Sequence, residues 1–400
     1  AVGELIEAGS LSGAGSGLPR EFEEEFREYV GADYCLTVNH GSTALASAYY
    51  AVGVGPGDEV ITPTVGYLGA YAGALHMGAR PVFCEVDPDT LQADPTDIEE
   101  RITERTAAIN VTHWNGRVCD MDLLLDIGER YDIPIVEDAA HAHGSKWDGE
   151  HIGNIGDVTC FSLQGVSPGG KPIAAGEGGI VTTNDREYYE RQLAFCHLHR
   201  AGVDEEFTLP EYDDLEKQML GLKWRAHPLA LAIAQVELKS LEYRCQRRIE
   251  NRERLFDRLR NLPGIRPVET YEKSDSAGFY GGLKMLYDSD ELDGLPVETF
   301  VEAVSAEGAP ISGPGFAYVE HLRSINRQGF DLWGDGRSPI QGEFCGLPAF
   351  EPYEEGDFPV AEDLDDRVLT LASFIEPAEG FIDQYAHAFE KVVSHREQLL

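Results

Sequence analysis

Short apolar runs alternate with amphipathic segments through the first 185 residues of the chain. The runs are rich in β-branched residues, which is typical of buried strands, and the segments between them repeat apolar residues at helical spacing. The predicted strands are residues 35–40, 59–64, 80–86, 107–113, 133–140, 158–163 and 178–184, and the clearest helices are 43–53, 67–77 and 121–131. This alternation predicts an α/β fold with a mostly parallel seven-stranded sheet between helices.

The pattern changes in the second half of the chain. Residues 228–262 keep a helical period and end at Pro-Gly, so they predict one long helix. Residues 265–400 mix short strands and helices around a Gly/Pro-rich middle. We therefore expect a large ligand-binding domain over 1–250, including an N-terminal segment, and a smaller C-terminal α+β domain over 251–400.

Composition and charge limit the partners. The chain is 42% hydrophobic and 26% charged, which is typical of a globular protein, and its formal net charge is −39. A surface this acidic repels nucleic acid and anionic membranes, and it is typical of a protein adapted to high salt. We expect neither nucleic acid nor a membrane as a partner.

The cysteines favour a reducing compartment. There are seven, an odd number, and no CxxC pair occurs, so we expect no disulfide framework. No apolar run is long enough for a bilayer, and the first residues lack the pattern of a signal peptide, which favours a cytoplasmic protein. The CHLHR run at 196–200 offers possible zinc ligands, but no complementary cluster lies near it, and we expect no metal site.

Several stretches of chemical interest directly follow predicted strands, at the edge where α/β sheets bind ligands. In NHGSTAL at 39–45, Gly41 permits a tight turn, and Ser42 and Thr43 bring hydroxyls and free N–H groups to a helix start. That arrangement suits a phosphate group, although Ser and Thr also serve as plain helix caps.

A second stretch, VEDAAHAHG, ends a buried strand with Glu137 and Asp138. A carboxylate in that position requires a cationic partner, because its desolvation is otherwise unfavourable. His141 and His143 follow, either as ligands or as packed side chains.

Two further residues have both a functional and a structural interpretation. Tyr67 follows a strand, where its ring can stack on a flat ligand or pack in the core. Lys171 lies in a Gly/Pro-rich loop; it is either solvated or, when partly buried, a nucleophile toward carbonyls. A phosphate cradle, an aromatic plane, a carboxylate and a lysine together meet the four needs of pyridoxal 5′-phosphate (PLP).

The order and spacing of these motifs resemble a known family. IVEDAAHAHGS, CFSLQ and KPIAAGEGGIVTTND resemble the DegT/DnrJ/EryC1/StrS sugar aminotransferases, which are fold-type I PLP enzymes. The resemblance covers nearly the whole chain. It implies a PLP-dependent aminotransferase that moves an amino group from glutamate or glutamine to a keto-sugar, either nucleotide-linked or a cyclitol, by a ping-pong Schiff-base mechanism. It also implies a homodimer.

The resemblance assigns a role to each matching residue. Lys171, five residues before the first Gly of GEGG, is the Schiff-base lysine, Asp138 pairs with the ring nitrogen, and His141 touches the ring. The remaining cofactor contacts it implies are Tyr67 on the ring face; Gly41, Ser42, Thr43 and Ser162 at the phosphate; and Lys223 at the phosphate of the neighbouring subunit. Trp114, His113 and the histidines of CHLHR are expected either in the substrate pocket or packed at a subunit interface.

Three departures from the family pattern affect the interpretation. Six residues, GVSPGG, separate Gln164 from Lys171, which is more than the family usually has. Lys223 and His141 replace the usual Asn and Gln, and His141 thereby adds a titratable group beside the cofactor.

Three alternative functions compete with this interpretation. A sugar dehydratase is disfavoured, because such relatives carry a histidine in place of the lysine. A non-catalytic PLP-binding regulatory protein does not require the complete set of catalytic residues. An NAD-dependent enzyme is disfavoured because GxGxxG is missing.

Overall fold

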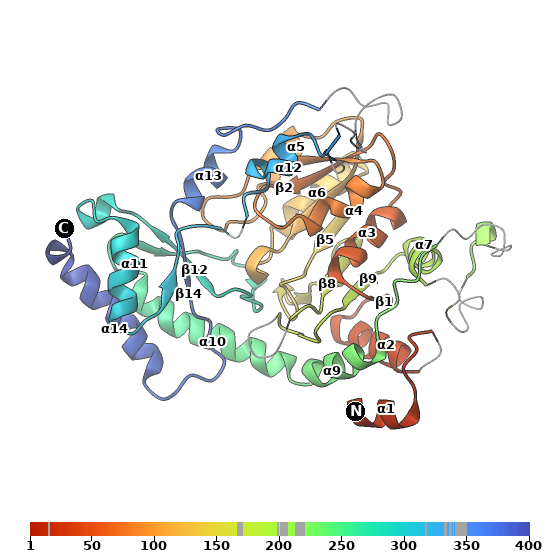
Figure 1. Cartoon of the computed structure of the whole chain (residues 1–400), viewed down its shortest axis with the longest axis horizontal. Coiled ribbons are helices and arrows are strands. Elements are labelled where there is room, and N and C mark those ends of the chain that lie inside the picture. Colours follow the sequence, from red (N-terminus) through yellow and green to blue (C-terminus); the bar gives the residue numbers. More distant parts are fainter. Residues whose placement is uncertain are drawn as a thin grey trace.

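A seven-stranded sheet forms the centre of the larger part of the molecule (Figure 1). The computed structural model describes residues 1–14, 17–165, 171–197, 200, 207–212, 221–316, 318–331, 334–335, 338, 340 and 350–400. The strands lie in the order β1 (Tyr34–Val38), β9 (Gly179–Thr183), β8 (Val158–Ser162), β5 (Ile135–Asp138), β4 (Thr106–Thr112), β2 (Glu59–Pro63) and β3 (Arg80–Cys84).

Six of these strands point the same way. Only β9 is reversed, since it pairs antiparallel with β1 on one side and with β8 on the other, while the remaining pairs are parallel. The prediction of a mostly parallel seven-stranded sheet is confirmed. The carboxyl ends of six strands and the amino end of β9 therefore meet at one edge.

Helices cover both faces of the sheet, and the strands are apolar because both of their faces are buried. On β5, Ile135 packs in the cluster shared with α2 and α6, whereas its neighbour Val136 packs in the cluster shared with α3. The helices of this part are α1 (Val2–Ala8), α2 (Leu18–Val30), α3 (Gly41–Ala51), α4 (Gly69–His76), α5 (Pro95–Glu100), α6 (Met121–Tyr131), α7 (Arg186–Cys196), η1 (Trp114–Gly116) and η3 (Pro210–Tyr212).

The prediction of one long helix over 228–262 is wrong. Two helices, α9 (Pro228–Leu238) and α10 (Leu241–Leu259), follow each other end to end (Figure 1). At the break, Arg244 donates to the carbonyl of Glu237 at 2.9 Å and pairs with its carboxylate at 2.8 Å. The guanidinium thus adds a donor to a carbonyl at the helix end that also accepts the Ser240 N–H at 3.2 Å.

The C-terminal part is built on an antiparallel sheet with the order β10-β12-β14-β13. The helices α10, α11 and α14 share its apolar core. Its elements are β10 (Ile265–Pro267), β12 (Leu283–Tyr287), η4 (Asp290–Leu292), α11 (Val297–Ala306), β13 (Ile311–Ser312), β14 (Val368–Leu371), α14 (Phe381–Ser394) and η6 (Arg396–Gln398). A small sheet of β11 (Ser274–Asp275), β6 (Lys146–Trp147) and β7 (Glu150–His151) joins residues of both halves of the chain.

A segment of the C-terminal half returns to the large sheet. It holds η5 (Glu320–Leu322), α12 (Ser324–Arg327) and α13 (Pro359–Asp365). Phe330 and Phe358 pack there in one cluster with Val65 and Phe83 of the first half. The division of the chain at residue 250, which lies inside α10, stays a prediction. No helix in the described ranges has the length and apolar character that crossing a membrane requires.

Candidate active site

A cavity of about 460 Å³ opens at the edge where the six parallel strands end. Its walls come from loops that follow β1, β2, β4, β5 and β8, from the approach to β9, and from two segments of the C-terminal half. The lining residues are His40, Gly66, Tyr67, Thr112, Trp114, Asp138, Ala140, His141, Gln164, Lys171, Glu177, Tyr280 and Tyr318. The strand-end rule thus brings together residues that lie far apart in the sequence.

Lys171 enters the cavity from the segment before β9. Burial lowers the pKa of its amine, while the charges of Asp138 and Glu177 oppose that shift. Its Nζ lies 5.8 Å from the centre of the Tyr280 ring. The amine is therefore partly desolvated and more readily deprotonated than a surface lysine, which is the condition for a nucleophile.

Asp138 is the last residue of β5 and is only 7% exposed. Burial raises the pKa of its carboxyl, opposed by the Ala140 N–H and the charge of Lys171. Within the described part of the chain, that N–H, at 3.0 Å, is the one hydrogen-bond donor to the carboxylate. The carboxylate can therefore accept a further hydrogen bond from a ligand in the cavity.

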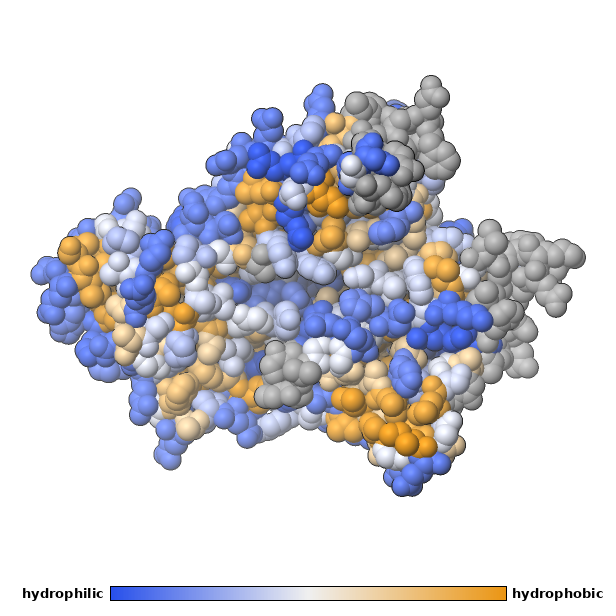
Figure 2. All heavy atoms as spheres, viewed as in Figure 1, coloured by the Kyte–Doolittle hydropathy of each residue, from blue (hydrophilic) through white to orange (hydrophobic). Residues whose placement is uncertain are grey.

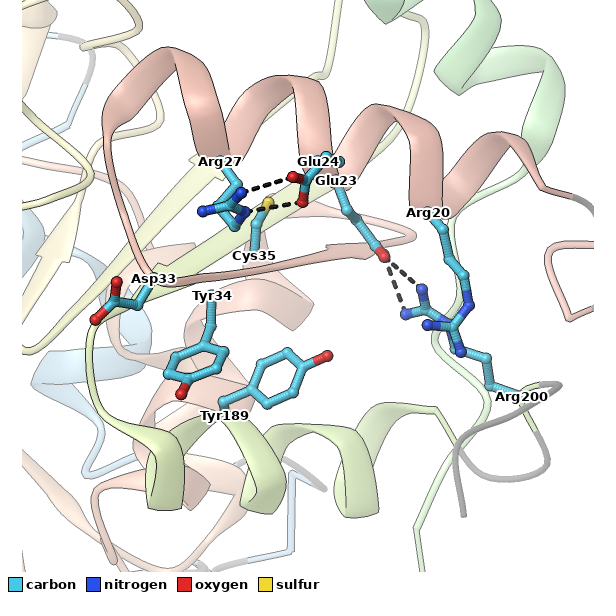
Figure 3. A pocket seen from close by; sticks show the side chains of 9 residues that line it. All are labelled: Arg20, Glu23, Glu24, Arg27, Asp33, Tyr34, Cys35, Tyr189 and Arg200. Carbon is cyan, nitrogen blue, oxygen red and sulfur yellow. Dashed lines mark hydrogen bonds and ion pairs between the residues drawn. The ribbon is translucent and has the colours of Figure 1, made fainter. Parts of the chain in front are cut away.

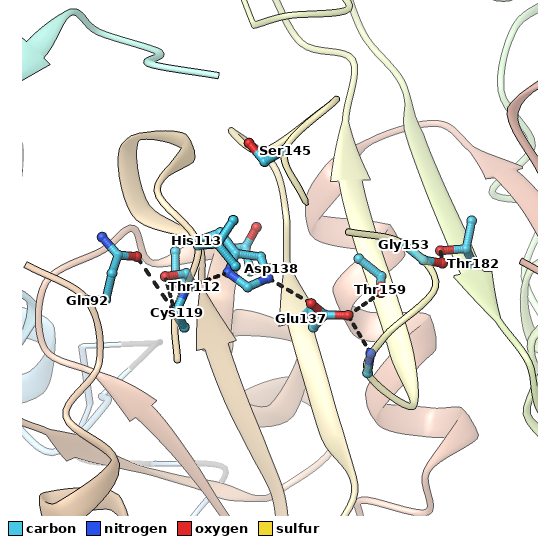
Figure 4. Close-up of polar contacts among 12 residues, drawn as sticks. Gln92, Thr112, His113, Cys119, Glu137, Asp138, Ser145, Gly153, Thr159 and Thr182 are labelled. Atoms are coloured by element: carbon cyan, nitrogen blue, oxygen red, sulfur yellow. Dashed lines mark hydrogen bonds and ion pairs between the residues drawn. The ribbon is translucent and has the colours of Figure 1, made fainter. Parts of the chain in front are cut away.

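The neighbouring Glu137 points the opposite way, into the core (Figure 4). Its Oε2 lies 2.8 Å from Nε2 of His113, and its Oε1 accepts from Thr159 Oγ1 at 2.6 Å and from the Gly156 N–H at 2.8 Å. The alternation of side chains along β5 thus assigns one carboxylate to the fold and the next to the cavity.

The start of α3 packs tightly against the end of β8. A Cβ added to Gly41 would lie 2.6 Å from Cβ of Ser162, so glycine alone fits there. The hydroxyl of Thr43 donates to the His40 carbonyl at 2.7 Å, and the Ser42 N–H donates to Nδ1 of His40 at 3.3 Å. This close approach brings two serine hydroxyls to one helix N-terminus, which is a suitable cradle for a phosphate.

His141 lies against Tyr280, with ring centres 4.5 Å apart, and its Nδ1 accepts the Asn115 N–H at 3.3 Å. Burial, together with the charges of Lys171 and Lys284, lowers the pKa of His141 to about 3. The imidazole is consequently neutral near pH 7. The expected contact of His141 with the cofactor ring stays a prediction.

Three further histidines that the sequence singled out, His113, His143 and His197, do not line this cavity. His113 is in the core with Glu137, and His143 is buried against Phe161, with ring centres 5.1 Å apart. His197 is buried beside α7. His199 and residues 166–170 of the GVSPGG spacer lie outside the described residues.

Lys223 is exposed and does not line the cavity of its own chain. It lies next to the β1 end of the site, because the Asn39 N–H donates to the Trp224 carbonyl at 2.7 Å and Val38 forms a β-bridge with Arg225. Its expected contact with a partner's cofactor stays a prediction.

Sequence reasoning missed three residues that line the cavity, the aromatic Tyr280 and Tyr318 and the polar Gln164. Tyr280 lies in the GFYGG loop and Tyr318 in a Gly/Pro-rich stretch, where no periodicity indicates a role. An aromatic residue flanked by glycines was the one signal that pointed to Tyr280.

A smaller polar cavity, of about 250 Å³, lies between α2 and the strand β1 (Figure 3). Glu23 and Arg200 form a buried ion pair there, and the N–H and hydroxyl of Thr37 donate to Glu23 at 2.9 and 2.8 Å. Arg27 pairs with Glu24 at 2.6 Å. The contacts of Glu23 attach α2 to β1 and to the residues after α7, and the Arg27–Glu24 pair lies within α2, so these groups have a structural role.

The fold and the lysine–aspartate pair in the cavity define a fold-type I, PLP-dependent transferase. The sequence model of the DegT/DnrJ/EryC1/StrS aminotransferase family matches residues 1–308. The chain belongs to this family and is a PLP-dependent aminotransferase.

Curated relatives match most or all of the chain. L-glutamine:2-deoxy-scyllo-inosose aminotransferase of Streptomyces fradiae is 33% identical over 414 aligned positions, which cover 100% of this chain and 92% of that protein. L-glutamine:scyllo-inosose aminotransferase of Streptomyces griseus is 32% identical over 382 residues, covering 94% and 86%.

Solved structures share the fold over nearly the whole chain. The aminotransferase from Psychrobacter cryohalolentis superposes with a TM-score of 0.81 at 24% identity, covering 99% of this chain and 96% of that one. DesV of S. venezuelae gives a TM-score of 0.77 at 26% identity, covering 99% and 93%.

The residues present fit PLP. The cradle at Gly41 accepts no side chain, the Asp138 carboxylate has capacity for one more donor, and the Lys171 amine is partly desolvated. The start of α3 with Ser42 and Ser162 would hold the phosphate, Asp138 the ring nitrogen, and Lys171 the aldehyde carbon.

Proposed function

We propose that this aminotransferase moves the amino group of glutamine to the carbonyl carbon of a keto-cyclitol, in two half-reactions at the same site. The names of the relatives at 32–33% identity support this donor and this class of acceptor. A nucleotide-linked keto-sugar is the other acceptor that the family resemblance allows. The observation that carries the proposal is the joint placement of Lys171, Asp138 and His141 in one cavity.

Three side chains of this chain have separate roles in the proposed reaction. When bound, the cofactor supplies an aldehyde that captures the amino group and a ring that takes up the electron pair. Lys171 accepts a proton from the reacting carbon and returns it, because burial lowers the pKa of its amine and so favours the unprotonated base. Asp138 holds a proton on the ring nitrogen by charge and hydrogen bonding. The neutral His141 packs against the ligand without competing for that proton.

Borohydride trapping tests this assignment. After incubation with PLP and reduction, mass spectrometry of a digest is expected to find the adduct on Lys171. Lys171→Ala is expected to abolish the adduct and to lower transamination by about a thousandfold or more. Lys273→Ala, at an exposed position paired with Asp122, is the control and leaves both unchanged. An adduct on another lysine contradicts the proposal. So does a wild-type enzyme whose bound cofactor glutamine does not convert to its amine form.

We further propose that two copies of the chain associate through the face that carries α1 and α9. Apolar side chains gather over these helices (Figure 2), and Ile6, Leu11, Ile233 and Val236 are 56%, 41%, 41% and 56% exposed. Exposed apolar clusters of this kind support association between subunits. In such a dimer Lys223 would contact the phosphate of the partner's cofactor, as the resemblance implies.

A further inference from the structure

We propose that Tyr318 determines which acceptor this aminotransferase takes, by forming with Tyr67 the wall against which the hydroxyl-rich ring of the acceptor packs. This inference rests on the proposed function. Tyr318 lies in the C-terminal half, after residue 308, where the match to the family model ends. The residue therefore belongs to a part of the chain that the shared family pattern does not describe.

The segment that carries Tyr318 is attached to the catalytic part by backbone contacts. Val319 forms a β-bridge with Val65, and the Glu320 N–H donates to the Thr64 carbonyl at 2.7 Å. Thr64 and Val65 lead directly from β2 to Tyr67. The two tyrosines are therefore held on adjoining backbones, one from each half of the chain.

A buried polar network fixes this junction. Nδ1 of His321 lies 2.6 Å from the Thr64 hydroxyl, and Nε2 lies 2.8 Å from the Glu362 carboxylate. His321 and Thr64 are completely buried. Both ring nitrogens of His321 have a hydrogen-bond partner. The imidazole therefore links the end of β2 to α13.

Glu320 anchors the same segment from the other side. Its carboxylate, 1% exposed, accepts the Tyr71 hydroxyl of α4, and Asn326 donates to that hydroxyl at 2.8 Å. Arg323 pairs with Glu320 at 3.3 Å. Buried polar groups that hydrogen-bond to one another in this way favour one geometry, so the position of Tyr318 is set before a substrate arrives.

The Tyr318 ring itself is held but not covered. The guanidinium of Arg323 lies 4.4 Å from its centre, and the Tyr67 ring lies 5.8 Å away at 45°. Tyr318 nevertheless stays 43% exposed and Tyr67 57% exposed. Two large aromatic rings that face a cavity while remaining this open offer a surface for a ligand.

The hydroxyl groups support the same conclusion. Tyr49, Tyr287 and Tyr385, which are buried, each donate to a backbone carbonyl. Tyr67, Tyr280 and Tyr318 line the cavity, and none of their hydroxyls has a hydrogen-bond partner among the described residues. A polyol ring presents C–H faces to aromatic rings and hydroxyls to such free groups, so it matches both properties of this wall.

Of these three tyrosines, Tyr318 is the one that has neither a cofactor contact implied by the resemblance nor a ring contact with His141. Tyr67 lies on the cofactor side by resemblance, and Tyr280 already packs against His141. Tyr318 approaches from the segment beyond residue 308, where the match to the family model ends, and it is held there by Arg323 rather than by a catalytic residue. Changing it is expected to affect the acceptor half-reaction and to leave the donor half-reaction intact.

The experiment measures both half-reactions in the PLP-loaded enzyme. Conversion of the bound cofactor by glutamine reports the donor step, and steady-state kinetics with 2-deoxy-scyllo-inosose and scyllo-inosose report the acceptor step. We expect Tyr318→Ala to raise the acceptor KM by about tenfold or more while the donor step changes by less than about twofold. Tyr318→Phe, which keeps the ring and removes the hydroxyl, is expected to give a smaller rise. Arg323→Gln, which loosens the ring, is expected to act in the same direction.

Tyr131→Ala, at an exposed tyrosine of α6 outside the cavity, is the matched control and changes neither step. An unchanged acceptor KM in Tyr318→Ala overturns the inference. An equal loss in both half-reactions also overturns it, because that result indicates a general structural role. If the wild-type enzyme itself shows no donor step with glutamine, the proposed function fails instead, and the two failures are thereby distinguished.

Discussion

Nε2 of His113 lies 2.8 Å from Oε2 of Glu137, and both side chains are completely buried directly behind Asp138 (Figure 4). Nδ1 of His113 accepts the Cys119 N–H at 3.2 Å, so the ring proton resides on Nε2 and is donated to the carboxylate. This pair joins β4 to β5 immediately beneath the site. It holds the strand end from which Asp138 reaches the cavity.

Glu137→Gln is expected to lower the free energy of unfolding by about 3 kcal/mol, because an amide presents donors to groups that are themselves donors. Burial opposes ionisation of Glu137, but hydrogen bonds from His113, Thr159 and Gly156 prevail and lower its pKa. The contribution is therefore present above the unfolded pKa of about 4.3 and is lost as the pH falls through the folded value. Urea unfolding at several pH values measures this, with the exposed Glu129→Gln as control. If the difference in free energy of unfolding between wild type and Glu137→Gln grows as the pH is lowered, this assignment of the Glu137 carboxylate is wrong.

Gly41→Ala is expected to weaken PLP binding by about tenfold, because the new Cβ would overlap Ser162 and displace the start of α3. Titration of the apoprotein with PLP, followed by absorbance, measures the affinity. Gly55→Ala is the control, since the nearest atom to its added Cβ is 3.9 Å away. Equal affinities for Gly41→Ala and wild type would show that the cradle does not hold the phosphate.

Lys171 is expected to react with an amine-acylating reagent at lower pH than Lys273 in the apoprotein. Burial lowers the pKa of Lys171, whereas the hydrogen bond and charge of Asp122 raise that of Lys273. Competitive labelling across pH, read by mass spectrometry, orders the two midpoints. Asp138→Asn removes a charge that raises the pKa of Lys171, so in that variant its midpoint should fall further. If the labelling midpoint of Lys171 lies at or above that of Lys273, the Lys171 amine is not desolvated as described.

Val236→Glu is expected to convert the proposed dimer to monomers, because it places a charge in the exposed apolar face of α1 and α9. Sedimentation velocity measures the change. Leu123→Glu on α6, where the leucine is 52% exposed, is the matched control and should stay dimeric. If both variants sediment as the wild type does, the subunits meet elsewhere.

The sheet and the main site residues were predictable because their causes are local. Strands such as β5 and β8 are buried on both faces, so β-branched and other apolar residues such as Ile135, Val136 and Val158 mark them in the sequence. Parallel strands also force their carboxyl ends to one edge, which is why the sequence alone places Asp138 and Ser162 near one another.

Other features depend on contacts that sequence patterns do not contain. The break between α9 and α10 falls at Lys239 and Ser240, residues that a helix tolerates, and it is accompanied by the contact of Arg244 with Glu237. Tyr318 reaches the cavity only because His321 and Glu320 dock on β2 and α4 from a segment about 250 residues away, so no local pattern indicates its place. The neutrality of His141 likewise follows from tertiary burial near two lysines.

His141→Gln is expected to keep transamination within about tenfold of the wild type and to leave the acid limb of its pH profile unchanged. The reason is that the folded pKa of about 3 keeps the imidazole neutral throughout the working range, so an uncharged amide replaces an uncharged ring. Stability should respond differently: below about pH 6.5 the unfolded wild-type chain binds a proton that the folded state rejects, so the wild type loses stability relative to the variant. Profiles of kcat/KM and urea unfolding at pH 5 to 8 measure both effects. An acid limb between about pH 6 and 7 that disappears in His141→Gln would show that the imidazole titrates in the active enzyme.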